Sequence, residues 1–423
     1  MTGPVPRDVD AKKLTIIGAG IVGICSGLEA IKAGYQVTIV DRLPPGAATS
    51  HGNAGVVSPW SVVPQALPGL WKSVPKWFLD PHGPVKVRWR DLPTTLPWVA
   101  AFFRHANAKE ATRISNAMAY LVRDNQEIYA GLLGEAGRPD LLRSSDMITV
   151  SRSPRRPDLQ DIGSRLRQRH GAKLEVLTGD ELREIEPFLS KEIRFGVATK
   201  NQSRCMDPGE ICKVLARHFE NQSGVILHQN VKAIVPKENG GFVLQCEGSE
   251  LFAQRLLLAA GAWSSKLLRP LGINLPLIGE RGYHLIFKDP QVTVNNSISD
   301  GDAKIILSEM TTGVRIAGTA EFADPDAAPN YARAKALQPL AKRLLPGLNT
   351  EPQVEWMGVR PSYPDNLPTI GPLGKFNGLF GAFGHSHYGF GMAPQTARLA
   401  VKLITGQSPN EDLSSVSFSR YGE

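Results

Sequence analysis

The stretch LTIIGAGIVGICSGLEAIKAGYQVTIVD, residues 14–41, decides the fold of this 423-residue chain. Its first four residues, 14–17, are apolar and mostly β-branched, which is typical of a buried strand. Gly18, Gly20 and Gly23 follow directly in the spacing G-x-G-x-x-G. In a nucleotide-binding turn, the first glycine permits the tight turn and the second lets backbone approach a pyrophosphate. The third glycine lets helix and strand pack closely.

The residues after the glycines complete the pattern. Residues 24–33 have helical composition, and residues 35–40 form a second strand-like run that Asp41 closes. The start of the helix would offer free N–H groups to phosphates, and the Asp41 carboxylate could accept hydrogen bonds from a ribose. This order of strand, glycines, helix, strand and acid predicts a dinucleotide-binding unit. The acid fits NAD and FAD equally and argues against NADP.

The composition is that of an ordinary soluble protein, with 42% hydrophobic and 21% charged residues, and the length suggests two or more domains. No apolar run approaches the roughly 20 residues that span a bilayer, and residues 1–13 have no apolar segment typical of a secretory signal. Four cysteines without C-x-x-C spacing predict reduced thiols and no metal site. The net charge of +8 could attract anionic substrates or a lipid surface, but we interpret it as a contribution to solubility. The sequence contains no nucleic-acid-binding motif.

Further elements of a Rossmann-like unit recur late in the chain. Residues 256–265, LLLAAGAWSS, predict a buried strand that runs into a glycine. Residues 379–406 predict a strand, a glycine-rich loop and a helix. A helix over 207–224 begins with Asp207 as its N-cap. This discontinuous layout favours a flavoprotein over a nicotinamide dehydrogenase, because the Rossmann unit of the latter is usually contiguous.

Several motifs together carry a family resemblance. The chain resembles the D-amino acid oxidase superfamily of FAD-dependent amine oxidoreductases over nearly its whole length, and it is most similar to bacterial D-amino acid dehydrogenases of the small-subunit type. The resemblance implies FAD, bound without a covalent link. Besides IIGAGIVGICSG and LLLAAGAWSS, the motifs are TSHGNAG (49–55), ERGYHLIF (280–287), WMGVRPSYPDNLPTIGP (356–372) and GHSHYGFGMAP (384–394).

The resemblance also implies how the domains are divided. We expect a Rossmann-like FAD-binding domain of the α/β class, built from residues 11–60, 202–275 and 355–423. The intervening residues 61–201 and 276–354 would form an α+β substrate domain with an antiparallel or mixed sheet.

By the same resemblance, the cofactor-binding residues come from every part of the FAD domain. The TSHGNAG backbone would approach the pyrophosphate and the flavin. The backbone of Val231, which follows the 207–224 helix, would pair with adenine. The start of the last helix would lie at the pyrimidine edge of the flavin, where negative charge develops on reduction. The predicted set is Gly18, Gly20, Ile21, Val22, Gly23, Asp41, Arg42, Thr49, Ser50, Asn53, Ala54, Gly55, Val231, Ala260, Gly261, Trp263, Arg360, Gly384, His385, Tyr388, Gly389, Phe390 and Gly391.

Four residues are candidates for the substrate site. In the superfamily, the arginine of G-x-R-P anchors the substrate carboxylate, and here this residue is Arg360. A guanidinium forms two parallel bonds to a carboxylate, although an ion pair with Asp365 is the structural alternative. Tyr283 could place its hydroxyl on the same carboxylate, and His385 and His387 would flank the flavin. Some relatives carry an arginine where His387 stands, which leaves a second permanent cation in doubt.

The implied reaction is the oxidative deamination of an amino acid. Hydride would pass from the α-carbon to flavin N5, and the resulting imine would hydrolyse to a keto acid and ammonia, with no dedicated general base. One alternative is oxidation of a secondary amine such as sarcosine, D-hydroxyproline or an opine. Another is a flavin subunit of a heteromeric dehydrogenase. The amino acid, its chirality and the oligomeric state stay open.

The electron acceptor would be a respiratory quinone or oxygen. Five of the seven tryptophans, at positions 60, 71, 77, 89 and 98, lie among basic residues and prolines in residues 60–104. Tryptophan with lysine or arginine suits a lipid interface, so we expect a cytoplasmic protein that could contact the inner membrane peripherally. A helical lid or an aromatic core is the alternative for this stretch.

Overall fold

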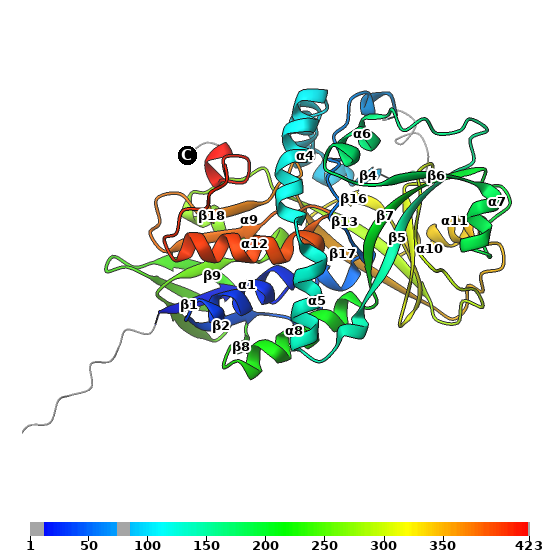
Figure 1. The fold of residues 1–423 in the computed structure, drawn as a ribbon. Helices are drawn as coiled ribbons and strands as arrows, with labels where there is room; N and C mark the ends of the chain where they lie inside the picture. The colour runs from blue at the N-terminus through cyan, green and yellow to red at the C-terminus, as the bar shows by residue number, and fades with distance from the viewer. Residues whose placement is uncertain (1–11, 74–84, 422–423) are drawn as a thin grey trace, which may run out of the picture.

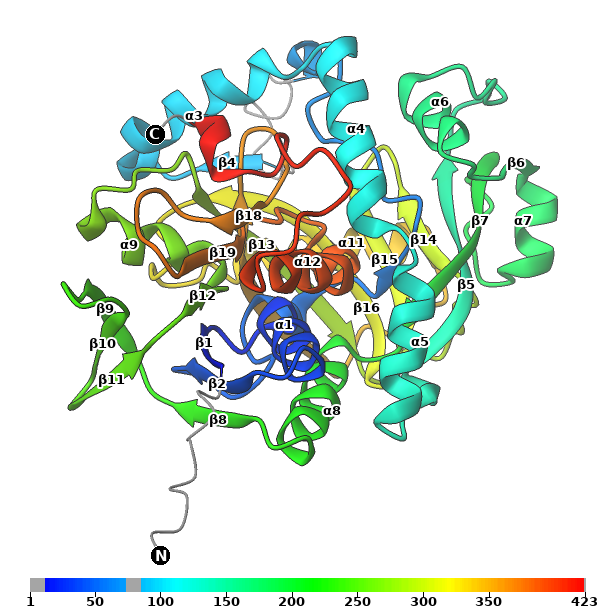
Figure 2. The same ribbon diagram turned by 60° about the vertical axis from the view of Figure 1, so that its left-hand side comes forward.

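The computed structural model describes residues 12–73 and 85–421. In them, two large β-sheets lie beside each other, with helices packed around them (Figures 1 and 2). One sheet has six strands and the other has ten, and a separate three-stranded sheet lies at the edge of the six-stranded one. The fold is therefore α/β, as the sequence predicts, with a Rossmann-like unit joined to a unit built on a mixed sheet.

The six-stranded sheet contains the strands that open the sequence. Its order is β18-β19-β12-β1-β2-β8, and all neighbours are parallel except β18 and β19. The chain proceeds from β1 to one side of the sheet and later returns to its other side, so the topological switch point lies at β1. In open α/β sheets, ligands bind at the carboxyl ends of the strands beside this point. The strands are β1 (Lys13–Ile17), β2 (Gln36–Asp41), β8 (Val225–His228), β12 (Leu256–Leu258), β18 (Thr369–Pro372) and β19 (Leu379–Phe383).

Helices α1 and α12 lie side by side over this sheet (Figure 2). Helices α4 and α5, from the region predicted to belong to the substrate domain, pack on α12 and share its apolar core. These two helices are separated at Asp124, which has a left-handed φ of 56°. The helices are α1 (Ile21–Lys32), α4 (Ala108–Val122), α5 (Asn125–Glu135), α8 (Pro208–Asn221) and α12 (Gly389–Ile404).

Helix α12 contains a proline beyond its first turn. Pro394 has no N–H, so the carbonyl of Phe390 four residues earlier loses its helical donor. The hydroxyl of Tyr129 donates to this carbonyl at 2.7 Å and replaces the lost bond. A proline is normally tolerated only in the first turn of a helix. The tertiary contact from α5 allows this helix to begin at Gly389, with Pro394 beyond its first turn.

The ten-stranded sheet carries the second unit. Its main order is β17-β13-β16-β15-β14-β5-β7-β3, with β4 beside β16 and β6 beside β7. Most neighbours are antiparallel, whereas β14 with β5 and β16 with β4 are parallel. The strands are β3 (Val56–Val57), β4 (Val85–Val87), β5 (Leu142–Ser151), β6 (Leu174–Thr178), β7 (Phe195–Cys205), β13 (Ile278–Phe287), β14 (Ser297–Asp300), β15 (Ile305–Met310), β16 (Gly313–Phe322) and β17 (Gln353–Ser362).

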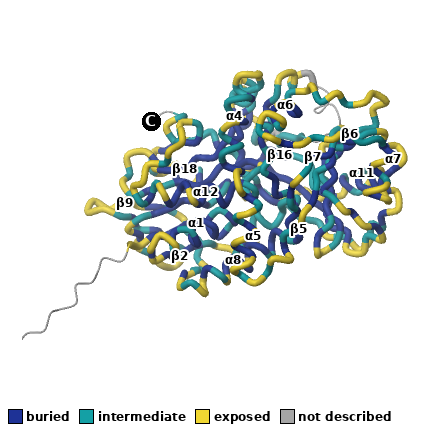
Figure 3. The backbone as a smooth tube through the Cα atoms, viewed as in Figure 1, coloured by how far each residue is buried: buried dark blue, intermediate teal, exposed yellow. Residues whose placement is uncertain are grey.

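The remaining elements complete three apolar cores, which lie under the helices of each unit and beneath the three-stranded sheet. Figure 3 shows the buried residues concentrated in the interior and the exposed ones along the outer loops. The remaining helices and strands are α3 (Leu92–Arg104), α6 (Ile162–Arg169), α7 (Gly179–Ile185), α9 (Ser264–Leu268), α10 (Ala332–Lys335), α11 (Leu337–Leu344), β9 (Val231–Pro236), β10 (Phe242–Cys246) and β11 (Ser249–Ala253). The 3₁₀ turns are η1 (Thr49–Gly52), η2 (Leu70–Ser73), η3 (Trp89–Asp91), η4 (Pro139–Leu141), η5 (Gly261–Trp263), η6 (Arg269–Leu271) and η7 (Phe418–Tyr421).

Strand membership differs from the predicted division of the chain. The sequence placed residues 355–423 in the cofactor-binding unit. Strand β17, however, pairs with β13 along its whole length, from Gln353 opposite Phe287 to Ser362 opposite Ile278. It therefore belongs to the ten-stranded sheet, because long-range backbone pairing decides which sheet a strand joins.

Candidate active site

A continuous cavity of about 1020 Å³ joins the two large sheets. This volume is at the upper end of the range typical of cofactor and small-molecule sites. One part of the wall contains the G-x-G-x-x-G turn and Asp41, at the carboxyl ends of β1 and β2. Another part contains Arg360, Glu280 and His387, from β17, β13 and the loop before α12. The candidate dinucleotide and substrate residues therefore line one cavity.

Each of the three positions in the turn requires glycine for a different physical reason. Gly18 has a φ of +117°, and a Cβ there would lie 2.4 Å from the Ala259 carbonyl oxygen. A Cβ on Gly23 would lie 1.9 Å from the Gly18 carbonyl oxygen. At Gly20, by contrast, the nearest atom that a Cβ would meet is Ser50 Oγ at 3.3 Å. Packing within the protein demands the first and third glycines, whereas Gly20 leaves bare backbone at the cavity, which fits a pyrophosphate.

The end of β2 also fits an adenosine. Asp41 Oδ2 accepts from the Ala19 amide at 2.6 Å, and Oδ1 accepts from the Leu43 amide at 2.9 Å. These bonds hold the carboxylate at the cavity, and each oxygen keeps a lone pair that could accept from a ribose. Arg42 stacks over the Trp263 ring at 4.6 Å from its centroid, so these two predicted residues lie together on the cavity wall.

The TSHGNAG loop bridges the two sheets. Thr49 Oγ1 donates to the Val359 carbonyl in β17 at 2.6 Å, and Ser50 Oγ accepts from the amide of Ile21 at the start of α1 at 3.0 Å. Arg315 of β16 donates from Nη1 to the carbonyls of His51 at 2.9 Å and Asn53 at 2.7 Å. This buried arginine was not predicted, because nothing local marks it as a partner of a loop some 260 residues earlier.

Twenty of the predicted cofactor-binding residues line the cavity, and Gly23, Gly55 and Gly384 do not. Each of these three glycines is required by packing inside the protein. A Cβ at Gly55 would lie 2.8 Å from Met310 Cε, and one at Gly384 would lie 2.1 Å from the Tyr363 ring. Their role is to let neighbouring segments approach each other closely.

Arg360 faces the cavity across strand β13. Its guanidinium lies directly over Gly282, where a Cβ would be 2.2 Å from Nη2 and 2.3 Å from Cζ. Nη1 donates to Glu280 Oε1 at 3.2 Å and to the Thr319 carbonyl at 3.2 Å. The Arg360 side chain keeps 21% of its surface exposed. Gly282 therefore provides the space in which the guanidinium lies flat against the sheet.

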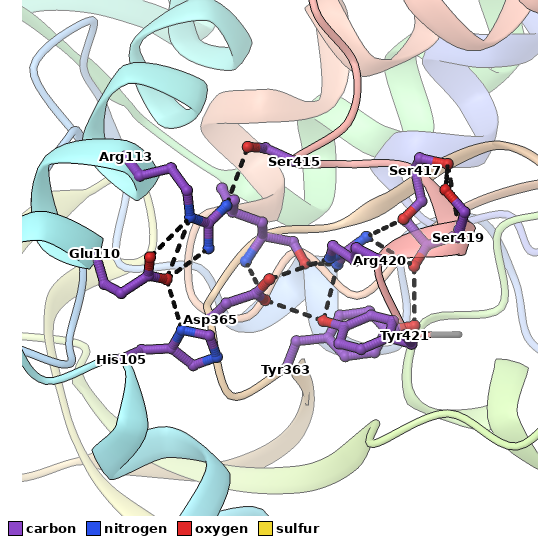
Figure 4. Close-up of polar contacts among 12 residues, drawn as sticks. His105, Glu110, Arg113, Tyr363, Asp365, Ser415, Ser417, Ser419, Arg420 and Tyr421 are labelled. Atoms are coloured by element: carbon purple, nitrogen blue, oxygen red, sulfur yellow. Dashed lines mark hydrogen bonds and ion pairs between the residues drawn. The ribbon is translucent and has the colours of Figure 1, made fainter.

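Asp365, the alternative partner considered for Arg360, is paired elsewhere. Its carboxylate accepts from Arg420 Nε at 3.1 Å and from the Tyr421 hydroxyl at 3.0 Å (Figure 4). The Tyr421 ring stacks on Tyr363 at 4.9 Å. These contacts fasten the C-terminal segment to the end of β17, so Asp365 has a structural role in this arrangement.

Figure 4 also shows a second ion-pair cluster, which ties helix α4 to the same C-terminal segment. Glu110 accepts from His105 Nδ1 and Arg113 Nη2, both at 2.9 Å, and Arg113 Nη1 donates to Ser415 Oγ at 3.0 Å. Helix α4 is thus joined to the C-terminal segment.

Glu280 is a central acid of the site that sequence reasoning missed. Only 3% of it is exposed, and its carboxylate accepts from Arg360, from His387 Nε2 at 2.5 Å and from Ser362 Oγ at 2.8 Å. Burial opposes its ionisation, but these partners outweigh burial and lower the pKa of Glu280 to about 2. Its position two residues before Gly282, on the same face of the strand, was a signal that could have identified it.

A chain of hydrogen bonds assigns the proton on His387. The Gln65 amide N–H donates to Asn366 Oδ1 at 2.8 Å, which directs Asn366 Nδ2 to Gln65 Oε1 at 3.0 Å. The Gln65 amide group must then turn its NH₂ toward His387 Nδ1, 2.9 Å away. The same Gln65 nitrogen lies 3.1 Å from His387 Nε2. The nearer ring nitrogen, Nδ1, accepts from Gln65, and Nε2 directs its proton toward Glu280.

Tyr283 and His385 have different environments from those expected. Tyr283 lies on the opposite face of β13 from Arg360, because side chains alternate along a strand, and its hydroxyl donates to Glu321 at 2.6 Å. Tyr283 lines the cavity, as expected of a site residue, but its hydroxyl is bonded to Glu321 and no hydrogen bond joins it to Arg360. His385 lines the cavity, and its Nε2 lies 3.0 Å from Thr396 Oγ1. Burial lowers the pKa of His385 to about 3, so it is neutral at pH 7.

Two further residues of the cavity wall were not predicted. Thr319 lies in an irregularity where β16 shifts register against β13, with a left-handed φ of 62°. Its hydroxyl is buried, lines the cavity and has no hydrogen-bond partner among the residues that the structure describes. Bulges near active sites commonly redirect side chains in this way. Arg167 of α6 adds a third guanidinium to the wall, besides those of Arg42 and Arg360.

The tryptophan-rich stretch has mixed surroundings. Trp60 Nε1 donates to the Lys200 carbonyl at 3.0 Å, and Trp98 Nε1 donates to the Ser362 carbonyl at 3.0 Å. Both rings line the cavity, whereas Trp71 is 63% exposed. Lys76 and Trp77 lie outside the described residues. Within residues 12–73 and 85–421, no helix is long and apolar enough to cross a bilayer.

Comparison with known proteins agrees with this geometry. The family model for FAD dependent oxidoreductases, DAO, matches residues 13–403. A D-amino-acid oxidase from Bradyrhizobium diazoefficiens is 35% identical over 419 residues, which cover 97% of this chain and 99% of that protein. A D-amino acid dehydrogenase from Rhodopseudomonas palustris is 28% identical over 420 residues, which cover 97% and 98% of the two chains.

Solved structures share the fold. A glycine oxidase from Bacillus cereus superposes with a TM-score of 0.73 at 18% identity, over 97% of this chain and 99% of its own. An FAD-bound L-α-glycerophosphate oxidase from Mycoplasma pneumoniae has a TM-score of 0.68 at 16% identity, over 95% and 97% of the two chains. The match over nearly the whole sequence, together with a cavity whose glycine turn and Asp41 fit a dinucleotide, shows that this chain belongs to the DAO family of FAD-dependent oxidoreductases.

Proposed function

We propose that the protein oxidises the C–N bond of an amino acid with FAD, in the manner of a D-amino acid dehydrogenase or oxidase. The observation that carries this proposal is the Arg360 guanidinium, which lies over Gly282 in the wall of the cavity that fits the cofactor. A planar cation in this position suits a carboxylate. The names of the relatives, a D-amino-acid oxidase and D-amino acid dehydrogenases, support an amino acid as substrate.

The residues of the chain would bind and orient the substrate. FAD, when bound, supplies the hydride acceptor. Gly20 and the start of α1 would hold its pyrophosphate and Asp41 would hold its ribose, and all of them line the cavity. Arg360 would fix the substrate carboxylate, and the buried walls from β13 and β17 would exclude water. The amino acid would bind as its zwitterion and give up its ammonium proton to solvent before the hydride leaves, because His385 is buried beside Thr396 and is not available to take that proton.

The electron acceptor and the site of action belong to the same proposal. The relatives divide between an oxidase and dehydrogenases, and we favour a membrane quinone over oxygen. Exposed apolar side chains in the tryptophan-rich stretch support a peripheral membrane contact, namely Trp71 at 63%, Leu92 at 41% and Leu96 at 55% exposure. We expect a cytoplasmic protein that reaches the inner membrane through this surface. A small heteromeric partner is the alternative route for electrons.

The direct test is anaerobic reduction of the bound flavin. The purified holoenzyme would be mixed with D-, L- and N-alkyl amino acids, and the loss of visible flavin absorbance would be recorded. We expect bleaching by D-amino acids. Bleaching by N-alkyl amino acids alone would favour the secondary-amine alternative, and no bleaching by any of them would contradict the proposal.

Arg360→Lys is the matched variant for this test, because it keeps the charge and loses the two-pronged geometry. Loss of one partner from a buried charged pair costs roughly 2–5 kcal/mol, so kcat/KM should fall by about 30-fold or more. An unchanged dependence on substrate concentration would assign Arg360 a structural role only.

A further inference from the structure

Arg360 does not face the cavity as an unpaired cation. Glu280 lies directly opposite it in the β13–β17 register, and their side chains form an ion pair of 3.2 Å. Glu280 is 3% exposed, whereas the Arg360 side chain is 21% exposed. Both residues line the cavity, and the acid is more deeply buried than the guanidinium.

The other groups around this pair add no permanent cation to it. Ser362 donates a neutral hydroxyl to Glu280, and the Thr319 carbonyl accepts from Arg360. His387 is directed toward Glu280 with its Nε2 proton, while Gln65 donates to Nδ1. The Arg360–Glu280 pair is therefore close to electrically neutral. A carboxylate that binds Arg360 must share one guanidinium with a second, buried carboxylate.

We propose that Glu280 is a specificity-determining residue that competes with the bound carboxylate for Arg360 and thereby keeps the site weak for purely anionic ligands. This inference rests on the proposed function, in which Arg360 anchors the substrate carboxylate. An amino acid zwitterion brings an ammonium group that offsets the charge of Glu280. The keto acid product has lost this nitrogen, and a dicarboxylate adds a second negative charge. Glu280 therefore favours amino acid over product and disfavours acidic substrates.

The test uses two keto acids as probes of the oxidised holoenzyme. Binding of 2-oxobutyrate, a monoanion, and 2-oxoglutarate, a dianion, would be measured from perturbation of the flavin spectrum. Glu280→Gln keeps the shape, and its amide can still accept from Arg360 and His387. We expect this variant to bind 2-oxobutyrate about tenfold more tightly, which corresponds to about 1.4 kcal/mol. The gain for 2-oxoglutarate should be larger, so discrimination between the two ligands should shrink.

The direction of the change separates this role from a structural one. A residue that merely orients Arg360 would, when replaced, loosen the guanidinium and weaken both keto acids. The matched control is Glu186→Gln. Glu186 is equally buried, at 2% exposure, and accepts from the Asn295 and Asn296 amides. It does not line the cavity, so we expect no change in either dissociation constant.

Unchanged or weaker keto acid binding by Glu280→Gln would overturn the inference, as would the absence of a spectral response to keto acids in both proteins. If the variant does not yield flavin-loaded protein, Glu280→Asp replaces it. The shorter side chain withdraws from the guanidinium and should give a smaller tightening, and no tightening would again refute the role. If amino acids fail to bleach the wild-type flavin but Glu280→Gln tightens keto acid binding, the competition stands and amine oxidation fails. Bleaching without tightening would instead support amine oxidation and refute the competition.

Discussion

Replacement of Gly282 by Ala should displace the Arg360 guanidinium while Arg360 itself remains in the chain. A Cβ at this position would lie 2.2 Å from Nη2, 2.3 Å from Cζ and 2.5 Å from Nη1 of Arg360. Carbon atoms in ordinary contact with such groups keep at least about 3.4 Å, so the guanidinium must move by about 1 Å. A misplacement of this size in a positioning group can cost about 100-fold in rate. We expect kcat/KM for the amino acid substrate to fall by about this factor.

The assay is stopped-flow flavin reduction under anaerobic conditions over a range of amino acid concentrations. Flavin content should be normal, because the glycine turn and Asp41 lie on the other sheet. Gly301→Ala is the control, because its Cβ would meet the nearest atom at 3.5 Å and the residue does not line the cavity. A Gly282→Ala enzyme with nearly wild-type kcat/KM would refute the reasoning, since the guanidinium would then not need this position.

Three other predictions concern the cofactor, pH and the membrane. Gly20→Val should block the pyrophosphate and yield mostly apoprotein, and a variant with full flavin absorbance would contradict that role. Burial lowers the pKa of His385 to about 3, so the stability that its neutral form contributes is complete above about pH 6.5. That contribution is lost as pH falls toward 3, by up to about 1.4 kcal/mol per pH unit. The melting temperature should therefore fall more steeply with acidification in wild type than in His385→Asn. The control, replacement of the exposed His228 by Asn, should behave like wild type. Parallel curves for all three proteins would contradict a role of His385 in acid stability. Anionic liposomes should bind the protein at low salt and release it at high salt, and the Trp71→Ala variant should bind them more weakly. If the protein does not float with liposomes and produces peroxide rapidly, it is an oxidase in which this stretch is an ordinary helical lid.

The nucleotide-binding unit was predictable because its determinants are local. Residues 14–41 contain the strand, the turn, the helix and the acid in one continuous stretch, and β1, α1 and β2 form within it. Gly23 is required by a contact within this stretch, the Gly18 carbonyl, whereas the space at Gly18 is limited by Ala259, which follows the neighbouring strand β12. The family resemblance, through the local motif G-x-R-P, likewise singled out Arg360, and the structure places it at the cavity.

The partners of the charged residues were not predictable in the same way. Asp365 lies only five residues from Arg360, yet it pairs with Arg420, while Arg360 pairs with Glu280, 80 residues earlier. Tyr283 was placed on the correct strand, but the phase of the strand turns it to Glu321. One residue of register decides which face a side chain occupies, and composition does not reveal that register.

The sequence by itself determined the dinucleotide-binding unit and the family and singled out Arg360, because each depends on motifs whose residues lie a few positions apart. Only the tertiary structure decided that Arg360 is neutralised by Glu280, that Gln65 and Asn366 orient His387, and that β17 joins the ten-stranded sheet. These features depend on pairing between strands and loops that are distant in the chain. The energy of such a pairing comes from burial and from hydrogen bonds that exist only once the whole fold has formed.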